Sequence, residues 1–246
     1  MEYENVQTTI AVLTDVHGNF PALKAVLDEI DKMSTAEHIY CLGDMIAIGP
    51  DTNKVLETLF ARDDVSMVTG NHEDEVLKIL NGETRTASGG EGKHHKWIAD
   101  RLDPKYIPML NGLPREIRTN INGHNLLFHH YHQNKEGQFS PIEKTPREEK
   151  LDYLYMDEQV DFVAFGHHHP VHFFETSSAI YLNPGSLGCF DKPYARYSIV
   201  KIDSEAINVS MKEVPYNNQN FLESYNKLQI PESEFILNIF HGNQHL

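Results

Sequence analysis

Three short apolar runs near the start of the chain each end on a polar residue and lead into a helical pattern. The runs are TTIAVLTD, HIYCLGD and VSMVTGN, which end at Asp15, Asp44 and Asn71. The segment after the first run, FPALKAVLDEIDKM, spaces its apolar residues as one face of a helix does. Three strand–loop–helix units in succession predict an α/β core with a mainly parallel sheet. In such a sheet, ligands bind at the carboxyl ends of the strands.

The rest of the chain predicts more strands and a few helices. REIRTNINGHNLLFHH indicates a hairpin around the turn dipeptide Asn122-Gly123. PREEKLDYLYM is expected to be helical, DFVAFGHHH and SAIYLNPGS to be strands, and ARYSIVKIDSEAINVSMKEV an antiparallel pair. We expect one domain over residues 1–246, with a helical tail at 217–240. The polar, glycine-rich start of 82–112 makes that region a candidate helical cap, with an ordinary surface excursion as the alternative.

The charge balance restricts the partners of the chain. Its formal net charge is −15, so its surface would repel a phosphate-rich polymer, and a nucleic-acid partner is not expected. A protein this acidic needs a local source of positive charge to bind phosphate, and a metal centre would supply it. The 15 histidines make metal chemistry a natural hypothesis.

The compartment follows from what the sequence lacks. Cys41 and Cys189 lie far apart and suggest neither a disulfide framework nor a thiolate zinc site. The acidic start MEYENVQ is unlike a secretory signal, and no apolar run approaches the length of a membrane span. We expect a soluble, cytoplasmic protein without a membrane partner. The sequence leaves the oligomeric state open.

Metal-ligand residue types recur at the ends of the predicted strands. They are Asp15, His17, Asp44, Asn71, His129, His167 and His169. Each one alone is weak, because an Asp at a strand end more often caps a helix. Their order, each at the edge where a site should form, strengthens the prediction of a metal site. Carboxylate, imidazole and amide oxygen together suit Mn, Fe, Ni or Zn, while the lack of nearby thiolates argues against a structural zinc site.

The triplet in FGHHHP raises the question of which histidines can share a site. In an extended segment, residues two apart lie on the same face. We therefore expect His167 and His169 to point together and His168 to point away.

Six stretches give the chain a resemblance to a known family. LTDVHGNFPAL, CLGDMIAIGP, VTGNHE, LLFHHYH, FGHHHP and YLNPGSLG resemble the motifs of calcineurin-like metallophosphoesterases, and most of all those of the small bacterial phosphodiesterases and nucleotide hydrolases. The matching elements run from Leu13 to Gly188. The resemblance implies a four-layer α/β/β/α sandwich, in which two sheets pack face to face between helical layers, and a centre of two metal ions.

The resemblance also implies a role for each candidate residue. It places Asp15, His17 and His169 on a first ion, Asn71, His129 and His167 on a second, and Asp44 between the two. Two ions held roughly 3.5–4 Å apart can acidify a bridging water for attack on phosphorus and neutralise the phosphoryl oxygens. Manganese is the expected metal, with Fe, Ni or Zn as alternatives. His72 would be the catalytic residue that stabilises or protonates the leaving group, the alternative being a histidine that caps the following helix.

Three further residues are candidate substrate contacts. Asn19 follows the DVHG stretch, and His130 stands where the bacterial branch usually has glycine. An outward-facing side chain is the alternative for His130. Tyr194 aligns where that branch often carries an arginine, and Arg196 is displaced from that position. His94, His95, His132 and His172 could line the cleft under the cap, but they are more simply explained as surface histidines, and Cys189 as a packing residue.

The expected activity is hydrolysis of phosphoester or phosphoanhydride bonds in small nucleotides or phosphodiesters, with diadenosine tetraphosphate as the most specific candidate. A broad-specificity phosphatase or phosphodiesterase is the main alternative. Ala47 and Ile48 replace the Asp and Arg of protein Ser/Thr phosphatases, which disfavours a phosphoprotein substrate. A non-catalytic scaffold similar to the retromer subunit of this fold is disfavoured because His72 and all the predicted ligands are present. Metal storage or sensing is disfavoured by the ordered phosphoesterase motifs.

Overall fold

The three N-terminal units form as predicted in the computed structural model, which describes residues 6–33, 36–83 and 88–244. The strands of these units are β1 (Thr8–Leu13), β2 (His38–Cys41) and β3 (Val65–Met67). They lie side by side in this order and pair in parallel. The helices that follow them are α1 (Phe20–Met33), α2 (Thr52–Phe60) and α3 (Asn71–Leu80). Helix α3 begins at Asn71. Asn71 and His72 therefore belong to the first turn of a helix and not to the end of a strand.

Two antiparallel strands complete the first sheet. They are β9 (Tyr194–Ile202) and β10 (Ile207–Pro215), the pair expected near the end of the chain. The order of strands across this sheet is β10-β9-β1-β2-β3. The ligand-bearing loops after β1 and β2 therefore leave neighbouring strands at the same edge of the sheet.

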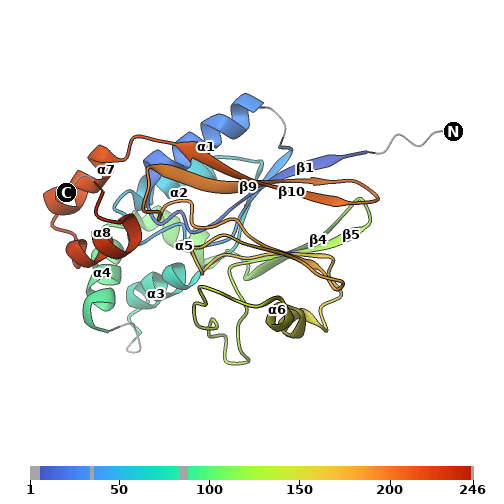
Figure 1. The fold of residues 1–246 in the computed structure, drawn as a ribbon. Helices are drawn as coiled ribbons and strands as arrows, with labels where there is room; N and C mark the ends of the chain where they lie inside the picture. Colours follow the sequence, from blue (N-terminus) through green and yellow to red (C-terminus); the bar gives the residue numbers. More distant parts are fainter. Residues whose placement is uncertain (1–5, 34–35, 84–87, 245–246) are drawn as a thin grey trace.

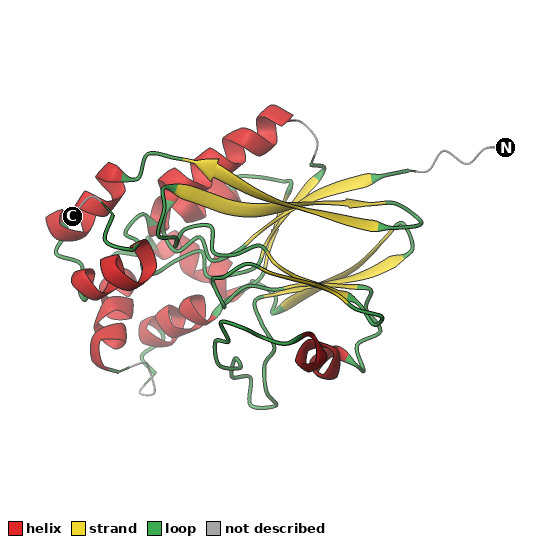
Figure 2. Ribbon diagram, viewed as in Figure 1, coloured by secondary structure: helices red, strands yellow, loops and turns green. Residues whose placement is uncertain are grey.

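A second five-stranded sheet faces the first (Figures 1 and 2). Its order is β4-β5-β6-β8-β7, built from β4 (Glu116–Ile121), β5 (His124–His129), β6 (Phe162–Ala164), β7 (His172–Glu175) and β8 (Ile180–Asn183). Strand β7 was not predicted. Asn122 and Gly123 have φ of 50° and 97°, the left-handed pair that the tight hairpin turn requires.

Helices cover the outer faces of both sheets. Helix α6 (Glu148–Tyr155) lies on the second sheet. The region expected as a cap contains α4 (Gly89–Ala99), a 3₁₀ turn (Pro104–Tyr106) and α5 (Ile107–Asn111), while residues 84–87 lie outside the described part. Two C-terminal helices form as expected, α7 (Gln219–Lys227) and α8 (Ser233–His241). None of the helices in the described ranges is long and apolar enough to cross a membrane.

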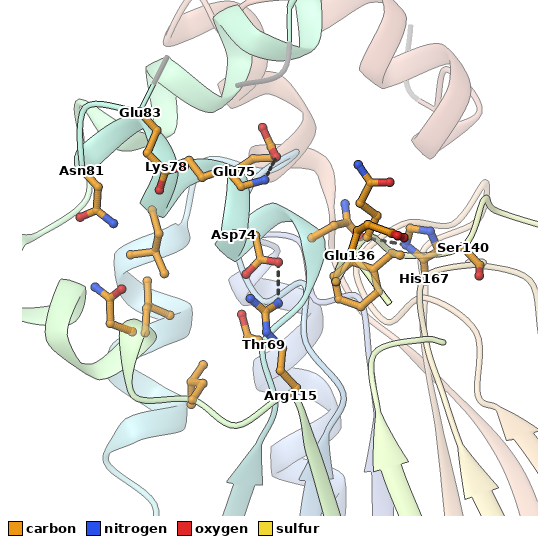
Figure 3. A pocket seen from close by; sticks show the side chains of 18 of the residues that line it. Thr69, Asp74, Glu75, Lys78, Asn81, Glu83, Arg115, Glu136, Ser140 and His167 are labelled. Atoms are coloured by element: carbon orange, nitrogen blue, oxygen red, sulfur yellow. Dashed lines mark hydrogen bonds and ion pairs between the residues drawn. The ribbon is translucent and has the colours of Figure 1, made fainter. Parts of the chain in front are cut away.

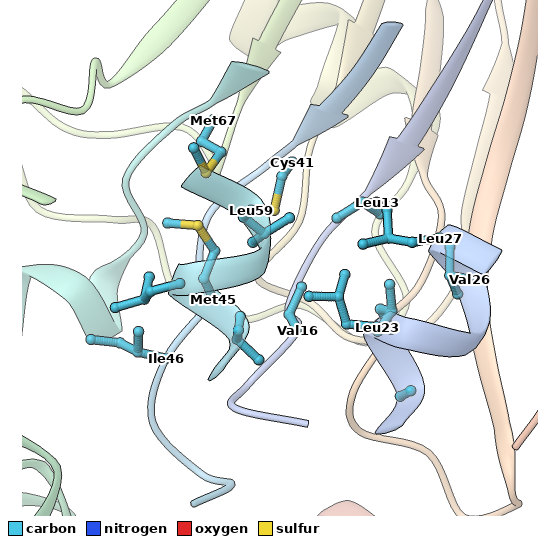
Figure 4. Packing of buried hydrophobic residues seen from close by; sticks show 14 of the residues in the cluster. Leu13, Val16, Leu23, Val26, Leu27, Cys41, Met45, Ile46, Leu59 and Met67 are labelled. Atoms are coloured by element: carbon cyan, nitrogen blue, oxygen red, sulfur yellow. The ribbon is translucent and has the colours of Figure 1, made fainter. Parts of the chain in front are cut away.

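The alternating side chains of the strands divide the core into layers. Ile10 and Val12 of β1 face the second sheet, whereas Leu13 points to the helices and packs with Leu23 of α1 and Leu59 of α2 (Figure 4). Each fully buried side chain of this size contributes about 1.5–3 kcal/mol through the hydrophobic effect. The predicted α/β/β/α arrangement is confirmed, and it brings the loops at the strand ends of both sheets together.

Candidate metal centre

Five predicted ligands lie on loops with a strained backbone. Positive φ angles occur at Asp15 (52°), His17 (49°), Asp44 (50°), His167 (67°) and His169 (66°). A side chain with a Cβ rarely adopts this conformation, which costs about 1–3 kcal/mol per residue and clusters at functional sites. Hydrogen bonds between the loops hold it in place: the N–H of His17 donates to the carbonyl of Asp44 at 2.9 Å, and that of Asp15 to Gly43 at 3.1 Å.

The NPGS stretch after β8 holds the first and last of these loops together. The Ser186 hydroxyl donates to the carbonyl of Asp15 at 2.8 Å, and its N–H donates to the carbonyl of His169 at 2.8 Å. The side-chain amide of Asn183 donates to the carbonyl of Gly166 at 2.8 Å. These residues fix the positions of two ligands without offering a ligand atom themselves.

Glu73 plays the same part for the loop of Asp44. Its buried carboxylate accepts hydrogen bonds from the N–H groups of Asp44, Met45, Ile46 and Gly70 at 2.8–3.1 Å. Burial and the charge of Asp44 raise the pKa of Glu73 to about 7. A Cβ at Gly70 would lie 2.2 Å from Asp44 Oδ1, so this close approach requires glycine. The sequence carried a signal for Glu73, because an acid three residues after a helix start typically bonds back to the N-terminal N–H groups.

Asp15, His17 and His169 form a first ligand group. The Nε2 atoms of the two histidines are 2.9 Å apart, and each lies 3.7 Å from Asp15 Oδ1. Nδ1 of His17 donates to the carbonyl of Ile46 at 3.4 Å, which leaves the Nε2 lone pair directed into the group. Such a carbonyl partner is the usual orienting contact of a metal-bound histidine. The structure brings together the three residues that were expected on one ion.

Asn71, His130 and His167 meet Asp44 in a second ligand group. Asn71 Oδ1 lies 3.0 Å from His130 Nε2 and 2.8 Å from His167 Nδ1. His130 Nε2 also lies 3.2 Å from Asp44 Oδ2. Nδ1 of His130 donates to the carbonyl of Leu42 at 2.7 Å, the same orienting contact as in the first group.

Asp44 lies between the two groups. An oxygen of its carboxylate is within 4.8 Å of ligand nitrogens of His17 and His72, and one is within the same distance of those of His130 and His167. Its Oδ1 also accepts a hydrogen bond from the N–H of His72 at 3.0 Å. This position is the one expected of a residue that serves two ions.

The charges of these groups fit divalent cations. Asp15 and Asp44 are almost wholly buried, and their ion-pair partners among the described residues are histidines alone. Burial would raise the pKa of Asp15, but the hydrogen bond with His17 and the charge of His169 lower it to about 2. Burial lowers the pKa values of His167 and His169 to about 4, so both imidazoles are neutral at pH 7. Buried carboxylates beside the neutral imidazoles of His167 and His169 form a donor set that suits a metal ion.

His129 does not join these groups, contrary to expectation. Its Nε2 lies 2.8 Å from the hydroxyl of Tyr155 on α6, on the outer face of the second sheet. Leu127 points to the same side and Phe128 to the first sheet, so the strand alternation carries His130 inward and His129 outward. His130, expected as a substrate contact or an outward-facing residue, takes the position in the second group. Burial would lower its pKa, but Asp44 raises it to about 9.

His72 stands beside the two groups and contacts a histidine of α4. Its Nε2 is 3.9 Å from Asp44 Oδ2, and its Nδ1 is 2.6 Å from Nε2 of His95. Burial lowers the pKa of His72 well below its usual range, although Asp44 opposes the shift. His94 and His95 were expected to be surface residues, but they are only 5% and 0% exposed. That expectation is wrong because α4 packs over the site.

The other candidate residues have mainly structural contacts. The side chain of Asn19 donates to the carbonyl of Gly188 at 2.8 Å and to the hydroxyl of Tyr216 at 2.9 Å, and it accepts from the N–H of Ala22 at 3.1 Å. Asn19 therefore caps α1 and leaves little capacity for a substrate. Tyr194 begins β9 and is not among the described residues that line the two openings of the site.

Arg196 is buried behind the first group. Its guanidinium donates to the carbonyls of His169 and Cys189 at 3.3 Å and lies 3.9 Å from the centre of the Phe190 ring. Its hydrogen bond to the carbonyl of His169 helps to hold the loop of that ligand in place. Cys189 is buried, which raises the pKa of its thiol well above the usual range. A packing role agrees with this, although its sulfur lies within 4.8 Å of ligand nitrogens of His17 and His169.

The remaining histidines lie away from the ligand groups. His168 packs against Tyr131, with ring centres 4.3 Å apart, and points away from both groups as expected. His172 belongs to β7 and is buried near Phe165, so the expectation of a surface position was wrong. His132 is half-buried and touches Tyr155.

Two openings lead to the ligand groups. A cavity of about 450 Å³ lies between the groups and helices α4 and α8. A wider groove of about 1350 Å³ runs past Asn71 and His167 along α3 (Figure 3). A substrate can therefore extend from the ligand groups in two directions.

Two facing sheets with paired ligand groups at their common edge define a metallophosphoesterase. The sequence profile of the calcineurin-like phosphoesterase superfamily domain matches residues 9–205, and the chain belongs to this superfamily of hydrolases. The family uses divalent metals. Helices α7 and α8 lie beyond the matched residues.

Individual relatives agree with this assignment. An uncharacterized protein of Methanocaldococcus jannaschii, MJ0912, is 26% identical over 250 residues, covering 92% of this chain and 96% of that protein. A hypothetical protein of Pyrococcus horikoshii, PH1004, has the same fold, with a TM-score of 0.78 at 18% identity over 96% of this chain and 98% of that one. The symmetrical bis(5'-nucleosyl)-tetraphosphatase of Erwinia tasmaniensis is 31% identical over 107 residues, which span 43% of this chain and 37% of that enzyme.

Proposed function

We propose that the protein is a dinuclear metal-dependent hydrolase of phosphoester bonds in small molecules. The observation that carries the proposal is the pair of ligand groups that share Asp44. The first ion would be held by Asp15, His17, His169 and Asp44, and the second by Asp44, Asn71, His130 and His167. His130 thus replaces the expected His129. Two bound divalent ions, with Mn²⁺ as the expected metal and Fe, Ni or Zn as alternatives, would acidify a water and neutralise phosphoryl oxygens.

His72 is the catalytic residue of this proposal. One of the facing nitrogens of His72 and His95 must carry the proton that they share at 2.6 Å. When His95 donates, His72 keeps its own proton on Nε2, the nitrogen that faces Asp44. A proton at that atom is placed for transfer to the leaving oxygen as the phosphorus–oxygen bond breaks. His95 would then be a positioning residue, because it fixes the tautomer of His72 without touching the substrate.

A second candidate function is hydrolysis of dinucleoside tetraphosphates. It is favoured by the partial similarity to the Erwinia tasmaniensis enzyme, which covers less than half of either chain. In that case the bond broken would be a phosphoanhydride, and the substrate would carry phosphate on both sides of it.

Metal titration and a hydrolysis assay test the proposal. Protein stripped of metal and reloaded with Mn²⁺ is expected to hold two ions per chain by elemental analysis. Hydrolysis of bis-p-nitrophenyl phosphate should rise with the second equivalent, because attack and charge neutralisation use both ions. Fewer than two ions after loading, or no hydrolysis of any ester in a panel of mononucleotides, cyclic dinucleotides, phosphopeptides and aryl phosphates, would contradict it.

A further inference from the structure

The cavity beside the ligand groups has a polar floor and a roof that carries two aromatic rings and two carboxylates. The floor consists of Asp44, Asn71, His72, His167 and His169. The roof, supplied by α4, α8 and the residue before α8, consists of Glu91, His94, His95, Glu232, Phe235 and Phe240. The Phe240 ring lies 5.5 Å from that of His169 and 6.4 Å from that of Phe235. An aromatic surface therefore adjoins the first ligand group directly.

Phe235 is 57% exposed although it is a large apolar residue. It lies in the first turn of α8, whose inward side packs Ile236 and Leu237 into a separate apolar cluster. Folding of the helix therefore does not bury Phe235. An organic group that enters the cavity would remove part of this ring from water, which is favourable at about 25 cal/mol per Å² of apolar surface.

The cavity has no positive side chain to match a second phosphate. None of the described residues that line it is Lys or Arg, and three are acidic: Asp44 in the floor, and Glu91 and Glu232 in the roof. Burial lowers the pKa of His94 to about 4, so this histidine is neutral at pH 7. Glu232 lies close against α4, since a Cβ at Gly90 would be 2.5 Å from its carboxyl carbon. Positive charge in the cavity would come from the floor alone.

The groove along α3 is no better suited to a phosphate chain. Among the described residues that line it, the two cations are already paired, Lys78 with Glu75 at 2.6 Å and Arg115 with Asp74 at 2.5 Å (Figure 3). Glu83, Glu91 and Glu136 also line this groove. A polyphosphate leaving the ligand groups in either direction would meet carboxylates, and contacts between like charges lower affinity.

From this charge pattern, and resting on the proposed function, we propose that the substrate is a phosphoester with a single phosphoryl group. Its organic part, apolar or aromatic and uncharged or cationic, lies against Phe235 and Phe240. Dinucleoside polyphosphates are poor substrates under this proposal. The ions would take the one phosphoryl group, and the roof would select the group attached to it.

A matched pair of chromogenic esters tests the proposal with the Mn²⁺-loaded full chain. The p-nitrophenyl ester of thymidine 5′-monophosphate and the γ-p-nitrophenyl ester of thymidine triphosphate share nucleoside and leaving group and differ by two phosphates. We expect kcat/KM to be at least about tenfold higher for the monophosphate ester, because electrostatic mismatch slows association. Diadenosine tetraphosphate should be hydrolysed more slowly than either ester. Preference for the triphosphate ester or for diadenosine tetraphosphate would overturn the inference of a single phosphoryl group and leave the proposed hydrolase function standing. Failure to hydrolyse any of the three compounds would overturn the proposed function as well.

Two variants assign the preference to the roof. Glu232→Lys should raise the relative kcat/KM for the triphosphate ester about tenfold, while Glu234→Lys should leave the ratio unchanged. Glu234 lies two residues further along, in the first turn of α8, and is an exposed residue that does not line the cavity. Phe235→Ala should lower kcat/KM for the thymidine monophosphate ester several-fold, and the matched Phe173→Ala, exposed on β7, should not. Equal shifts in the paired variants, with metal content intact, would contradict the role given to the roof.

Discussion

The floor and the roof of the cavity are built in opposite ways. The floor is polar, lies on strained loops and on the first turn of α3, and is fixed by buried hydrogen bonds such as those of Glu73 and Ser186. The roof carries two aromatic rings and two carboxylates, lies on α4, α8 and the residue before α8, and leaves Phe235 largely exposed. The superfamily profile covers every floor residue and stops before α8. The residues that would perform the chemistry lie within the matched segment, whereas half of the roof residues, those of α8 and the residue before it, lie beyond it.

The difference follows from the precision that each task needs. A metal ligand must be held within about 0.5 Å of its working position, which takes support from a network of neighbouring groups. A substrate-selecting wall needs only suitable shape and charge, so a helix can supply it. Changes in the floor should therefore be costly and changes in the roof mild.

The largest expected effect is on the floor. His72→Ala removes the residue that would protonate the leaving oxygen, and it should lower kcat by about 10²–10⁴-fold. Metal content by elemental analysis should stay at the wild-type level, because none of the proposed ligands is changed. The loss should be larger for an alkyl phosphodiester than for bis-p-nitrophenyl phosphate, whose leaving group needs little protonation. Wild-type activity in this variant would refute the role of His72.

Substitution of two adjacent histidines tests which of them belongs to the second ligand group. His130→Ala should weaken Mn²⁺ binding by more than the roughly 10–100-fold that loss of a partner of a ligand costs. His129→Ala, which loses only a contact with Tyr155, should bind Mn²⁺ with nearly wild-type affinity. Calorimetric titration of both variants measures this difference. The reverse order would restore His129 as the ligand.

His95 is a roof residue that contacts His72 of the floor. It therefore tests whether the roof only selects the substrate or also contributes to the chemistry. If it positions His72, His95→Ala should lower kcat about tenfold with KM unchanged, mainly for alkyl leaving groups. His95→Gln, whose amide can still donate a hydrogen bond, should recover part of kcat. A residue that merely shaped the roof would change KM, equally for both kinds of leaving group.

The last prediction concerns stability and not activity, through a buried histidine of the roof helix α8. His241 of α8 is buried against the hydroxyl of Tyr225 at 3.0 Å, and burial lowers its pKa to about 3. Below the usual pKa of about 6.5, the unfolded chain binds a proton that the folded chain excludes, so stability falls as the pH drops from about 6.5 toward 3. At pH 5 this group costs about 2 kcal/mol. Between pH 7 and pH 5, the free energy of unfolding of His241→Gln should therefore fall by about 2 kcal/mol less than that of the wild type. Equal falls in the two proteins would contradict the assignment.

Much of the fold could be read from local sequence patterns. The alternation in TTIAVLTD and the helical spacing in FPALKAVLDEIDKM produce β1 and α1 because neighbouring residues decide which face is buried. Turn chemistry at Asn122-Gly123 placed the hairpin. The short strand β7, whose side chains alternate less clearly between buried and exposed, gave too little signal to predict.

The histidines show where such reasoning applies. Strand alternation distinguishes His129 from His130, but only once it is known which face of β5 meets the first sheet. The same alternation was invoked for His167 and His169, yet β6 ends at Ala164 and these residues have left-handed φ angles. They do reach different groups, as expected, but loop geometry and not strand alternation places them there.

The sequence by itself determined the residue types of the centre and the strands that precede them. Asp15, Asp44 and Asn71 could be identified because each comes shortly after the end of one of three neighbouring parallel strands. Tertiary structure alone decided that His95 would touch His72 and that Phe235 would face the ligand groups. Their helices lie far from most of the floor residues in sequence, and their placement depends on how layers pack. Local periodicity encodes which face of an element is buried, but not which distant side chain it meets there.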